Sequence, residues 1–295
     1  MEPTKPPEIS PYILAVEGDL AAAGYSTAST TASTNKKKRK HPPSSSCLPL
    51  PPLPALYNST GDSKSTTVTL NAACPSILVT GSARLCVQSG AITVLGCSVE
   101  EQQNVLLRCG RSGYGHAQIV HLLHLTSTAT IEFDSLTDAG EKSFQLFDPD
   151  SYSSHSDIPI IQINSSWEAT SNKIIAKAQQ RIEQQIRPRV TLVSGAKGVG
   201  KSTFLRYHLN QCLSFSSKVA VLDCDVGQPE FGVPGVLTLS FREEGVLGPP
   251  PEYMGLGCGP EDKAYFFGDI TSKFDPMRYT SMVSSLFQVR EAMCS

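Results

Sequence analysis

Residues 190–209, VTLVSGAKGVGKSTFLRYHL, decide the fold of this chain. The first part is an unbroken β-branched and apolar run, which is typical of a strand buried on both faces of a parallel sheet. Gly195 to Ser202 then match the pattern GxxxxGK[ST], and apolar residues recur at helical spacing after them. A strand, a glycine-rich loop and a helix in this order predict an α/β P-loop NTPase domain built on a parallel sheet.

Each residue type in the loop suits a phosphate ligand. The glycines permit backbone angles that turn successive N–H groups toward phosphate oxygens, and the helix that begins near Lys201 presents its positive end to the same anion. We expect Lys201 to reach the β and γ phosphates of ATP and the Ser202 hydroxyl to bind Mg²⁺. The predicted nucleotide-binding residues are Gly195, Ala196, Lys197, Gly198, Val199, Gly200, Lys201, Ser202 and Thr203.

A second apolar strand, predicted over 218–222, ends in Asp223-Cys224-Asp225. Strand, helix and strand in this order imply a right-handed parallel crossover, which brings the end of the second strand beside the loop. Asp223 and Asp225 lie two residues apart and therefore point to one side of the strand. One carboxylate there could hold Mg²⁺ while the other accepts a proton from an attacking hydroxyl. The alternative is that both aspartates only cap a turn.

The remaining segments differ in composition. Residues 1–65 are rich in Pro, Ser, Thr and Ala and are expected to form a disordered tail. Residues 66–160 contain short β-branched segments broken by Gly, Asn and Ser, which predict a β-rich domain with a last strand over 127–135 and irregular structure over 136–164. Residues 165–187 are predicted to be a linker helix, and residues 188–295 the P-loop domain.

Two basic features could contact nucleic acid. The run KKKRK at 36–40 predicts a nuclear localisation signal, the alternative being a solvated charge block without a receptor. On the linker helix, Lys173, Lys177 and Arg181 are four residues apart and form either a ridge for a phosphate backbone or an ordinary solvated face. The formal net charge of the whole chain is −2, so no general positive field indicates such a partner.

Other functional classes find little support in the composition. The first residues lack a secretory signal and no apolar run is long enough to span a bilayer, so we expect a soluble protein without a membrane partner. The nine cysteines include no CxxC pair. Most lie in apolar segments, such as Cys86, Cys97, Cys109 and Cys224, and are interpreted as buried, reduced thiols. A zinc site that combines Cys109 with nearby histidines fits no common ligand spacing.

Three blocks occur in order: GAKGVGKSTFLR, LDCDVGQPEFGVPGVLTLS and YFFGDITSKFDPMRY. Together they resemble the polynucleotide 5′-hydroxyl kinases of RNA processing, and most closely the nucleolar branch that acts in ribosomal RNA maturation. The second and third blocks are more specific than the loop itself. The resemblance covers about residues 188–290, and residues 66–135 are more weakly similar to the amino-terminal domain of that family.

The resemblance implies transfer of the ATP γ-phosphate to the 5′-hydroxyl of an RNA or DNA end, in the nucleus and its nucleolus, alongside rRNA-processing proteins. ATP and Mg²⁺ are the implied cofactors. Lys201, Asp225 and Asp223 are the implied catalytic residues, with Asp225 as the base or positioning carboxylate. The implied metal ligands are Ser202, Asp223 and Asp225. Gln228, Thr271 and Ser272 are the implied substrate contacts.

The sequence departs from the family after the third block. Asp275 and Pro276 open a final helix with a predicted core face, and the sequence stops at Ser295, whereas the kinases continue with a clasp over the terminal nucleotide and an arginine-bearing lid. Because a supplied arginine contributes about 10³–10⁵ to the rate of phosphoryl transfer, we expect this chain to bind ATP and to transfer phosphate poorly unless a partner supplies the lid.

Two other functions stay open from the sequence. One is a switch ATPase of the group whose loop is GKGGxGK[ST], although Ala196 stands where that group has a lysine. The other is a non-catalytic nuclear scaffold that retains the nucleotide fold.

Overall fold

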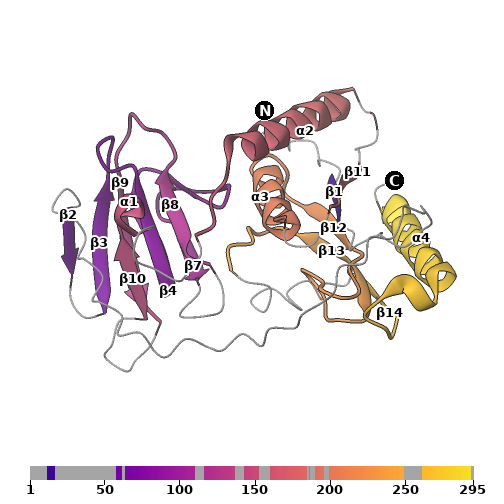
Figure 1. The fold of residues 1–295 in the computed structure, drawn as a ribbon. Helices are drawn as coiled ribbons and strands as arrows, with labels where there is room; N and C mark the ends of the chain where they lie inside the picture. The colour runs from indigo at the N-terminus through magenta and orange to yellow at the C-terminus, as the bar shows by residue number, and fades with distance from the viewer. Residues whose placement is uncertain are drawn as a thin grey trace, which may run out of the picture.

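The computed structural model describes residues 12–16, 58–61, 64–109, 116–136, 143–152, 160–184, 186, 190–195, 199–248 and 261–293. The described residues form two units that lie side by side (Figure 1). A nine-stranded sheet makes the β unit, and a five-stranded sheet with helices makes the P-loop unit.

All strand pairs of the β unit are antiparallel. Its strands are β2 (Asn58–Gly61), β3 (Ser65–Leu70), β4 (Ser76–Ser89), β5 (Ile92–Val94), β6 (Cys97–Val99), β7 (Asn104–Arg108), β8 (Gln118–Leu122), β9 (Ala129–Ser135) and β10 (Phe144–Phe147). The long strand β4 pairs with four others, and alternate residues such as Ile131 and Phe133 of β9 are completely buried. The β-branched segments therefore form the β-rich unit that their alternation predicts.

The stretch 136–164, predicted to be irregular, contains strand β10 and the short helix α1 (Pro149–Tyr152). Phe144 of β10 packs against Phe133, with ring centroids 6.0 Å apart, and Phe147 packs against Tyr152 at 5.0 Å. β10 also pairs with β4, where Phe144 lies opposite Gly81, so the four-residue strand is stabilised by tertiary contacts that local periodicity does not reveal.

The P-loop unit contains the elements that surround the glycine-rich loop. They are β1 (Tyr12–Val16), α2 (Ser165–Glu183), β11 (Val190–Val193), α3 (Lys201–Leu213), β12 (Val219–Asp223), β13 (Val236–Arg242), β14 (Lys263–Phe266), the 3₁₀ turn η2 (Ser272–Phe274) and α4 (Pro276–Met293). The predicted strand, loop, helix and second strand are present. The strand order is β11-β1-β12-β13-β14.

The sheet of the P-loop unit is mixed, which corrects the expectation of a parallel sheet. β11, β1 and β12 are parallel, whereas β13 is antiparallel to β12 and β14 to β13. Residues 224–235, which join β12 to β13, include two prolines and three glycines and form no helix. A parallel return needs a longer crossover, so β13 runs back as an antiparallel neighbour.

The amino-terminal tail also differs from expectation. Residues 12–16, within the segment expected to be disordered, form β1 between β11 and β12. The strand that ends in Asp223 is therefore separated from the P-loop strand by one strand instead of lying directly beside it. The basic run 36–40 lies outside the described residues.

Helix α2 packs on α3 through polar and aromatic contacts. The Asn164 side chain caps α2 by accepting a hydrogen bond from the Trp167 amide at 2.9 Å. The Trp167 ring meets Phe204 edge-on at 5.6 Å, and Ser171 Oγ lies 2.8 Å from His208 Nδ1 in the buried contact between the helices. The predicted linker helix is thus fixed against the helix that follows the glycine-rich loop.

The buried His208 should make stability depend on pH. Burial lowers the pKa of His208 to about 4, whereas an unfolded histidine titrates near 6.5, as a rough reference. As pH falls below about 6.5 the unfolded chain is protonated first, so stability is lost progressively until about pH 4. Between pH 7 and pH 4, urea titrations should show the free energy of unfolding falling by about 3 kcal/mol more in the native protein than in a His208→Phe/Ser171→Ala variant.

The native protein is measured against the variant because Asp223 also changes stability with pH, in the direction opposite to His208. Burial raises the pKa of Asp223 to about 6, so its protonation favours the folded state as pH falls toward the unfolded value, equally in both proteins. Parallel pH profiles for the native protein and the variant would contradict the assignment of His208 as a buried neutral side chain.

The two units are joined by buried hydrogen bonds and by a shared apolar core. Asn210 of α3 donates from Nδ2 to the Leu95 carbonyl at 2.9 Å and accepts at Oδ1 from the Val246 amide at 2.7 Å. Tyr207 and Leu247, both from the P-loop unit, belong to the apolar cluster of the β unit. The units therefore pack as one body instead of meeting only through a linker.

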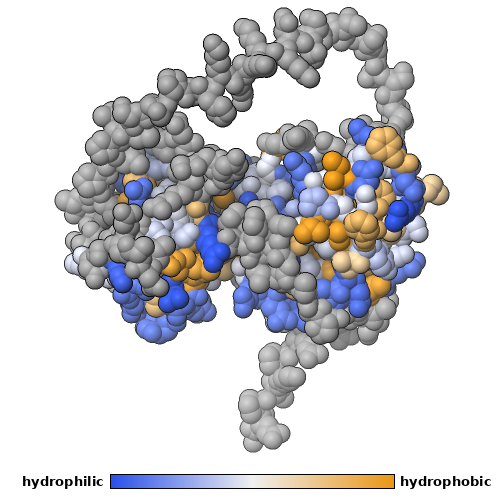
Figure 2. All heavy atoms as spheres, turned by 90° about the horizontal axis from the view of Figure 1, so that it is seen from below, coloured by the Kyte–Doolittle hydropathy of each residue, from blue (hydrophilic) through white to orange (hydrophobic). Residues whose placement is uncertain are grey.

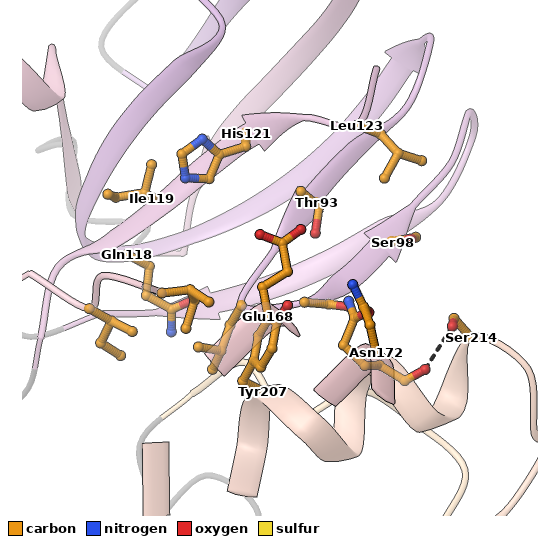
Figure 3. Close-up of a pocket in the computed structure, with 15 residues that line it drawn as sticks. Thr93, Ser98, Gln118, Ile119, His121, Leu123, Glu168, Asn172, Tyr207 and Ser214 are labelled. Carbon is orange, nitrogen blue, oxygen red and sulfur yellow. Dashed lines mark hydrogen bonds between the residues drawn. The ribbon is translucent and has the colours of Figure 1, made fainter. Parts of the chain in front are cut away.

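A cavity of about 550 Å³ lies where the units meet. Figure 3 shows side chains from both units around it: Thr93, Ser98 and His121 from the β unit, and Glu168, Asn172 and Tyr207 from α2 and α3. Burial lowers the pKa of His121, so this imidazole is less readily protonated than a free histidine. Among the described residues that line it there is no lysine or arginine.

Other expectations concern cysteines, metals and membranes. Cys109 and Cys224 are buried and Cys86 and Cys97 half-buried, all four as free thiols, and burial raises the pKa of Cys109 to about 12. Among the described residues, no three His, Cys, Asp or Glu side chains come together as a metal site. Within the same residues, no helix combines the length and apolar character needed to cross a membrane.

Candidate nucleotide-binding site

The glycine-rich loop joins the end of β11 to the start of α3. Gly200, the residue before α3, has φ 89°, in the left-handed region that favours glycine. A Cβ atom at this position would lie 2.8 Å from the Trp167 ring. In the described structure no side chain caps α3, so the N–H groups of its first turn are open to an anion. The central loop residues Ala196, Lys197 and Gly198 lie outside the described residues.

The first turn of α3 carries the predicted cation and hydroxyls. Lys201, Ser202 and Thr203 are all half-buried there. The Lys201 side chain runs over the beginning of the loop, since its Cδ lies 3.8 Å from where a Cβ on Gly195 would stand. The predicted phosphate-binding residues that the structure describes are thus gathered around one helix end. Val199 lies there too, with its Cγ2 3.4 Å from where a Cβ on Gly195 would stand, although its side chain is exposed.

Asp223 folds the loop that follows β12. Its side chain is completely buried. Oδ2 accepts hydrogen bonds from the amides of Glu230 and Phe231 at 2.6 and 2.9 Å, and Oδ1 accepts one from the Asp225 amide at 3.1 Å. Burial raises the pKa of Asp223 to about 6, and the three N–H donors act in the opposite direction. In the structure Asp223 therefore holds this loop in position, and its metal-binding and catalytic roles stay predictions.

Removing this carboxylate should destabilise the fold. Asp223→Ala leaves three backbone N–H groups without their acceptor, so we expect a loss of about 3 kcal/mol or more in the free energy of unfolding. Urea unfolding measures the loss, with Asp134→Ala, a half-buried aspartate in β9, as the control. Unchanged stability together with a lost Mg²⁺ requirement for ATP binding would instead support a metal-ligand role.

Asp225, the second of the two aspartates, uses only one carboxylate oxygen for hydrogen bonds in the described structure. It is half-buried, and its Oδ1 accepts hydrogen bonds from the amides of Gly227 and Gln228, both at 2.9 Å. Among the described residues no hydrogen bond is made by Oδ2. A carboxylate fixed by its own turn through one oxygen, with the other oxygen open, suits a metal or proton-accepting role. The Gln228 side chain beside it is exposed.

The third sequence block, residues 265–279, packs against the loop that follows β12. The Ile270 carbonyl oxygen lies 2.9 Å from where a Cβ on Gly227 would stand, and the Tyr279 hydroxyl donates a hydrogen bond to the Cys224 carbonyl at 2.9 Å. Thr271 and Ser272, both half-buried, follow Ile270 directly. Thr271 caps η2 and Asp275 caps α4, where its Oδ1 accepts from the Arg278 amide at 3.0 Å, as the predicted cap requires.

A buried ion pair ties α3 to the same loop. Arg206 Nε lies 3.1 Å from Glu230 Oε1, both side chains are almost fully buried, and Arg206 Nη1 donates to the Gly248 carbonyl at 3.0 Å. Neither residue was assigned a role from the sequence, and neither was Trp167, which packs over Gly200. A charged residue within the apolar pattern of α3 was the available signal. The pair links the helix after the P-loop to the loop that carries Asp225.

Apolar side chains lie on the surface of the P-loop unit (Figure 2). Near the third block the most exposed are Phe266, Phe274 and Met277, at 71%, 84% and 81%. Exposed apolar groups gathered beside a candidate site are typical of interaction surfaces.

Comparison with known proteins identifies the region that holds this site. Residues 195–295 match the family model of the mRNA cleavage and polyadenylation factor CLP1 P-loop. The chain is 38% identical over 102 residues to "Polynucleotide 5′-hydroxyl-kinase NOL9" of Arabidopsis thaliana, which is 35% of this chain and 27% of that protein. It is 38% identical over 98 residues to the Homo sapiens protein of the same name, which is 33% of this chain and 13% of that protein.

A solved structure extends the likeness in fold. "Structure of wild-type Clp1p-Pcf11p (454 -563) complex" is similar with a TM-score of 0.50 and 14% identity, over 79% of this chain and 51% of that one. The matches thus span a minor part of the curated relatives and about half of the structural one. The P-loop fold is confirmed, and so is the resemblance inferred from the three sequence blocks: residues 195–295 match the CLP1 P-loop model, and about a third of this chain is similar to proteins named polynucleotide 5′-hydroxyl-kinase.

Proposed function

We propose that this chain binds ATP with Mg²⁺ and serves as a polynucleotide 5′-hydroxyl kinase that transfers the γ-phosphate to the 5′-hydroxyl of RNA ends. The main support is the position of two groups. The uncapped start of α3, with Lys201 and Ser202, follows β11, and the open oxygen of Asp225 follows β12. Both strands are parallel to β1, so both groups lie at the same edge of the sheet. In open α/β sheets ligands bind outside the carboxyl ends of the strands.

The residues present fit ATP and Mg²⁺. The positive end of α3 has no side-chain cap in the described structure and no acidic residue in its first turn, which suits a phosphate group. The Ser202 hydroxyl and Asp225 would hold Mg²⁺, because hydroxyl and carboxylate oxygens are hard ligands of the kind that this ion prefers. When bound, Mg²⁺ would neutralise charge on the β and γ phosphates.

The same residues would then take part in the transfer step, Asp225 in addition to its contact with Mg²⁺. Lys201 binds the β and γ phosphate oxygens, and the N–H groups of α3 orient them. Asp225 accepts the proton of the 5′-hydroxyl while the hydroxyl oxygen bonds to the γ-phosphorus and the bond to ADP breaks. Gln228, exposed beside Asp225, and Thr271 and Ser272, in the adjoining block, would contact the polynucleotide.

The finer setting of this reaction is also a proposal. We infer ribosomal RNA processing in the nucleus and nucleolus, with 5′-hydroxyl RNA ends as the substrate and rRNA-processing proteins as partners, from the names of the relatives and from the basic run 36–40. Imaging a fluorescent fusion, with the five basic residues replaced by alanine as the comparison, tests the location.

The deciding experiment incubates the protein with γ-labelled ATP, Mg²⁺ and a 5′-hydroxyl RNA oligonucleotide. We expect label at the 5′ end, and none on an oligonucleotide that already carries a 5′-phosphate. Released labelled phosphate without a labelled oligonucleotide would show an ATPase. Failure to bind ATP at all, with nuclear location retained, would show a scaffold.

A further inference from the structure

Strand β1 is inserted between the two strands that lead to the nucleotide site. On one side Leu14 pairs with Thr191 of β11, and on the other side the same residue pairs with Val221 of β12, both in parallel register. The register continues along the strand, from Ile13 to Val16 on the β11 side and from Tyr12 to Val16 on the β12 side. A five-residue segment near the amino terminus thus makes two parallel ladders, with partners 177 residues later in β11 and 207 residues later in β12.

The two neighbours of β1 do not pair with each other. Adjacent strands lie roughly 4.8 Å apart, so β11 and β12 are separated by about 9.6 Å. All three strands run in the same direction, and β1 therefore sets how far the loop after β11 stands from Asp225, which follows β12. Without β1, the facing backbone edges of β11 and β12 would lack hydrogen-bond partners.

The composition of the segment suits this position. Tyr12-Ile13-Leu14-Ala15-Val16 is a continuous apolar run, as expected of a strand in a parallel sheet covered on both faces. The neighbouring β12 is buried at all five positions, and α3 packs across both β1 and β12. A polar or proline-containing segment would not fit between them.

We propose that the slot between β11 and β12 is a binding site for a parallel apolar strand, that its occupant is Tyr12–Val16 of the same chain, and that nucleotide binding depends on this insertion. The amino-terminal segment then acts as a positioning element of the P-loop unit, by strand addition within one molecule. The strand placement stands by itself, whereas the effect on nucleotide binding rests on the proposed function.

Engineered disulfides in the full chain test the placement. Leu14→Cys/Thr191→Cys and Leu14→Cys/Val221→Cys each join neighbouring strands in register and should crosslink on mild oxidation, as assigned by mass spectrometry of the digested protein. Thr191→Cys/Val221→Cys should not crosslink, because a disulfide needs Cα atoms within about 7 Å and two strand spacings are longer. A crosslink in this third variant, or none in the first two, would overturn the proposal. The assignment must exclude the native cysteines, of which six are free in the described structure.

ATP binding to the intact protein tests the dependence. Leu14→Pro removes a backbone donor from a strand that is paired on both sides, so we expect ATP affinity to fall by about tenfold or more in equilibrium dialysis. The matched control, Leu20→Pro, places the same substitution in the tail beyond β1 and should leave the affinity unchanged. Equal affinity in both variants would overturn the dependence.

The two experiments separate the two proposals. If the native protein binds no ATP while the disulfides form as expected, the proposed function fails and the strand insertion stands. If ATP binds but Thr191→Cys/Val221→Cys crosslinks, the strand insertion fails and the proposed nucleotide binding stands.

Discussion

Replacing Lys201 by alanine is expected to abolish detectable transfer of label from ATP to a 5′-hydroxyl oligonucleotide. The side chain extends over the start of the loop at the uncapped end of α3, where it would bind the phosphates. In related phosphoryl transfers, an arginine that stabilises the negative charge of the transferred group contributes about 10³–10⁵ to the rate, and we expect the loss of the Lys201 charge to act in the same way. Losing a hydrogen bond to a charged group costs about 1.5–3 kcal/mol, so ATP affinity should fall roughly ten- to a hundredfold.

Lys263→Ala is the matched control, because Lys263 is an exposed lysine on β14 that has no proposed part in the site. This control variant should bind ATP and transfer label to the oligonucleotide as the native protein does. Thermal unfolding of both variants guards against a general loss of structure. Transfer that persists at the native rate in Lys201→Ala would mean that the label comes from a contaminating kinase or that another residue binds the phosphates.

Asp225→Asn should separate binding from chemistry. The asparagine Oδ1 can still accept the hydrogen bonds from the amides of Gly227 and Gln228, so the turn should persist. The variant loses the negative charge that would take the proton of the attacking hydroxyl, a contribution of about 10²–10⁴ in rate. We therefore expect transfer to fall by this factor while ATP affinity changes by less than about tenfold.

The readout is the split between the two measurements. Single-turnover transfer of label gives the chemical step, and equilibrium dialysis of ATP gives affinity. A variant that loses ATP affinity and transfer in equal proportion would assign Asp225 to holding the nucleotide and its metal, and would leave the proton acceptor to be found elsewhere.

Local signals in the sequence predicted the parts of the site that depend on neighbouring residues. The glycine before α3, the apolar run of β12 and the Asp275 cap of α4 each follow from residues within one turn or strand, and the structure contains all three. The task of Asp223 could not be predicted in this way. Its partners are backbone amides seven and eight residues later, and which carboxylate is buried depends on how that loop closes.

Long-range pairing accounts for the other differences. The YILAV segment was too short to stand out from a tail rich in Pro, Ser and Thr, and its pairing partners lie beyond the whole β unit. The Arg206–Glu230 pair likewise joins a helix to a loop across another strand. Periodicity and motif spacing describe only one segment at a time, so such contacts emerge only from the fold.

The shared core has a consequence for how the molecule can be divided. Tyr207 of α3 and Leu247, after β13, complete the apolar interior of the β unit, and Asn210 satisfies backbone groups on both sides of the boundary. If the two halves were expressed separately, each would lose side chains that fill its core or pair its backbone groups. We therefore expect neither half to fold when it is moved alone into another protein. In a calorimeter the pair should melt as one cooperative transition, and recombination between relatives should succeed only when both halves are inherited together.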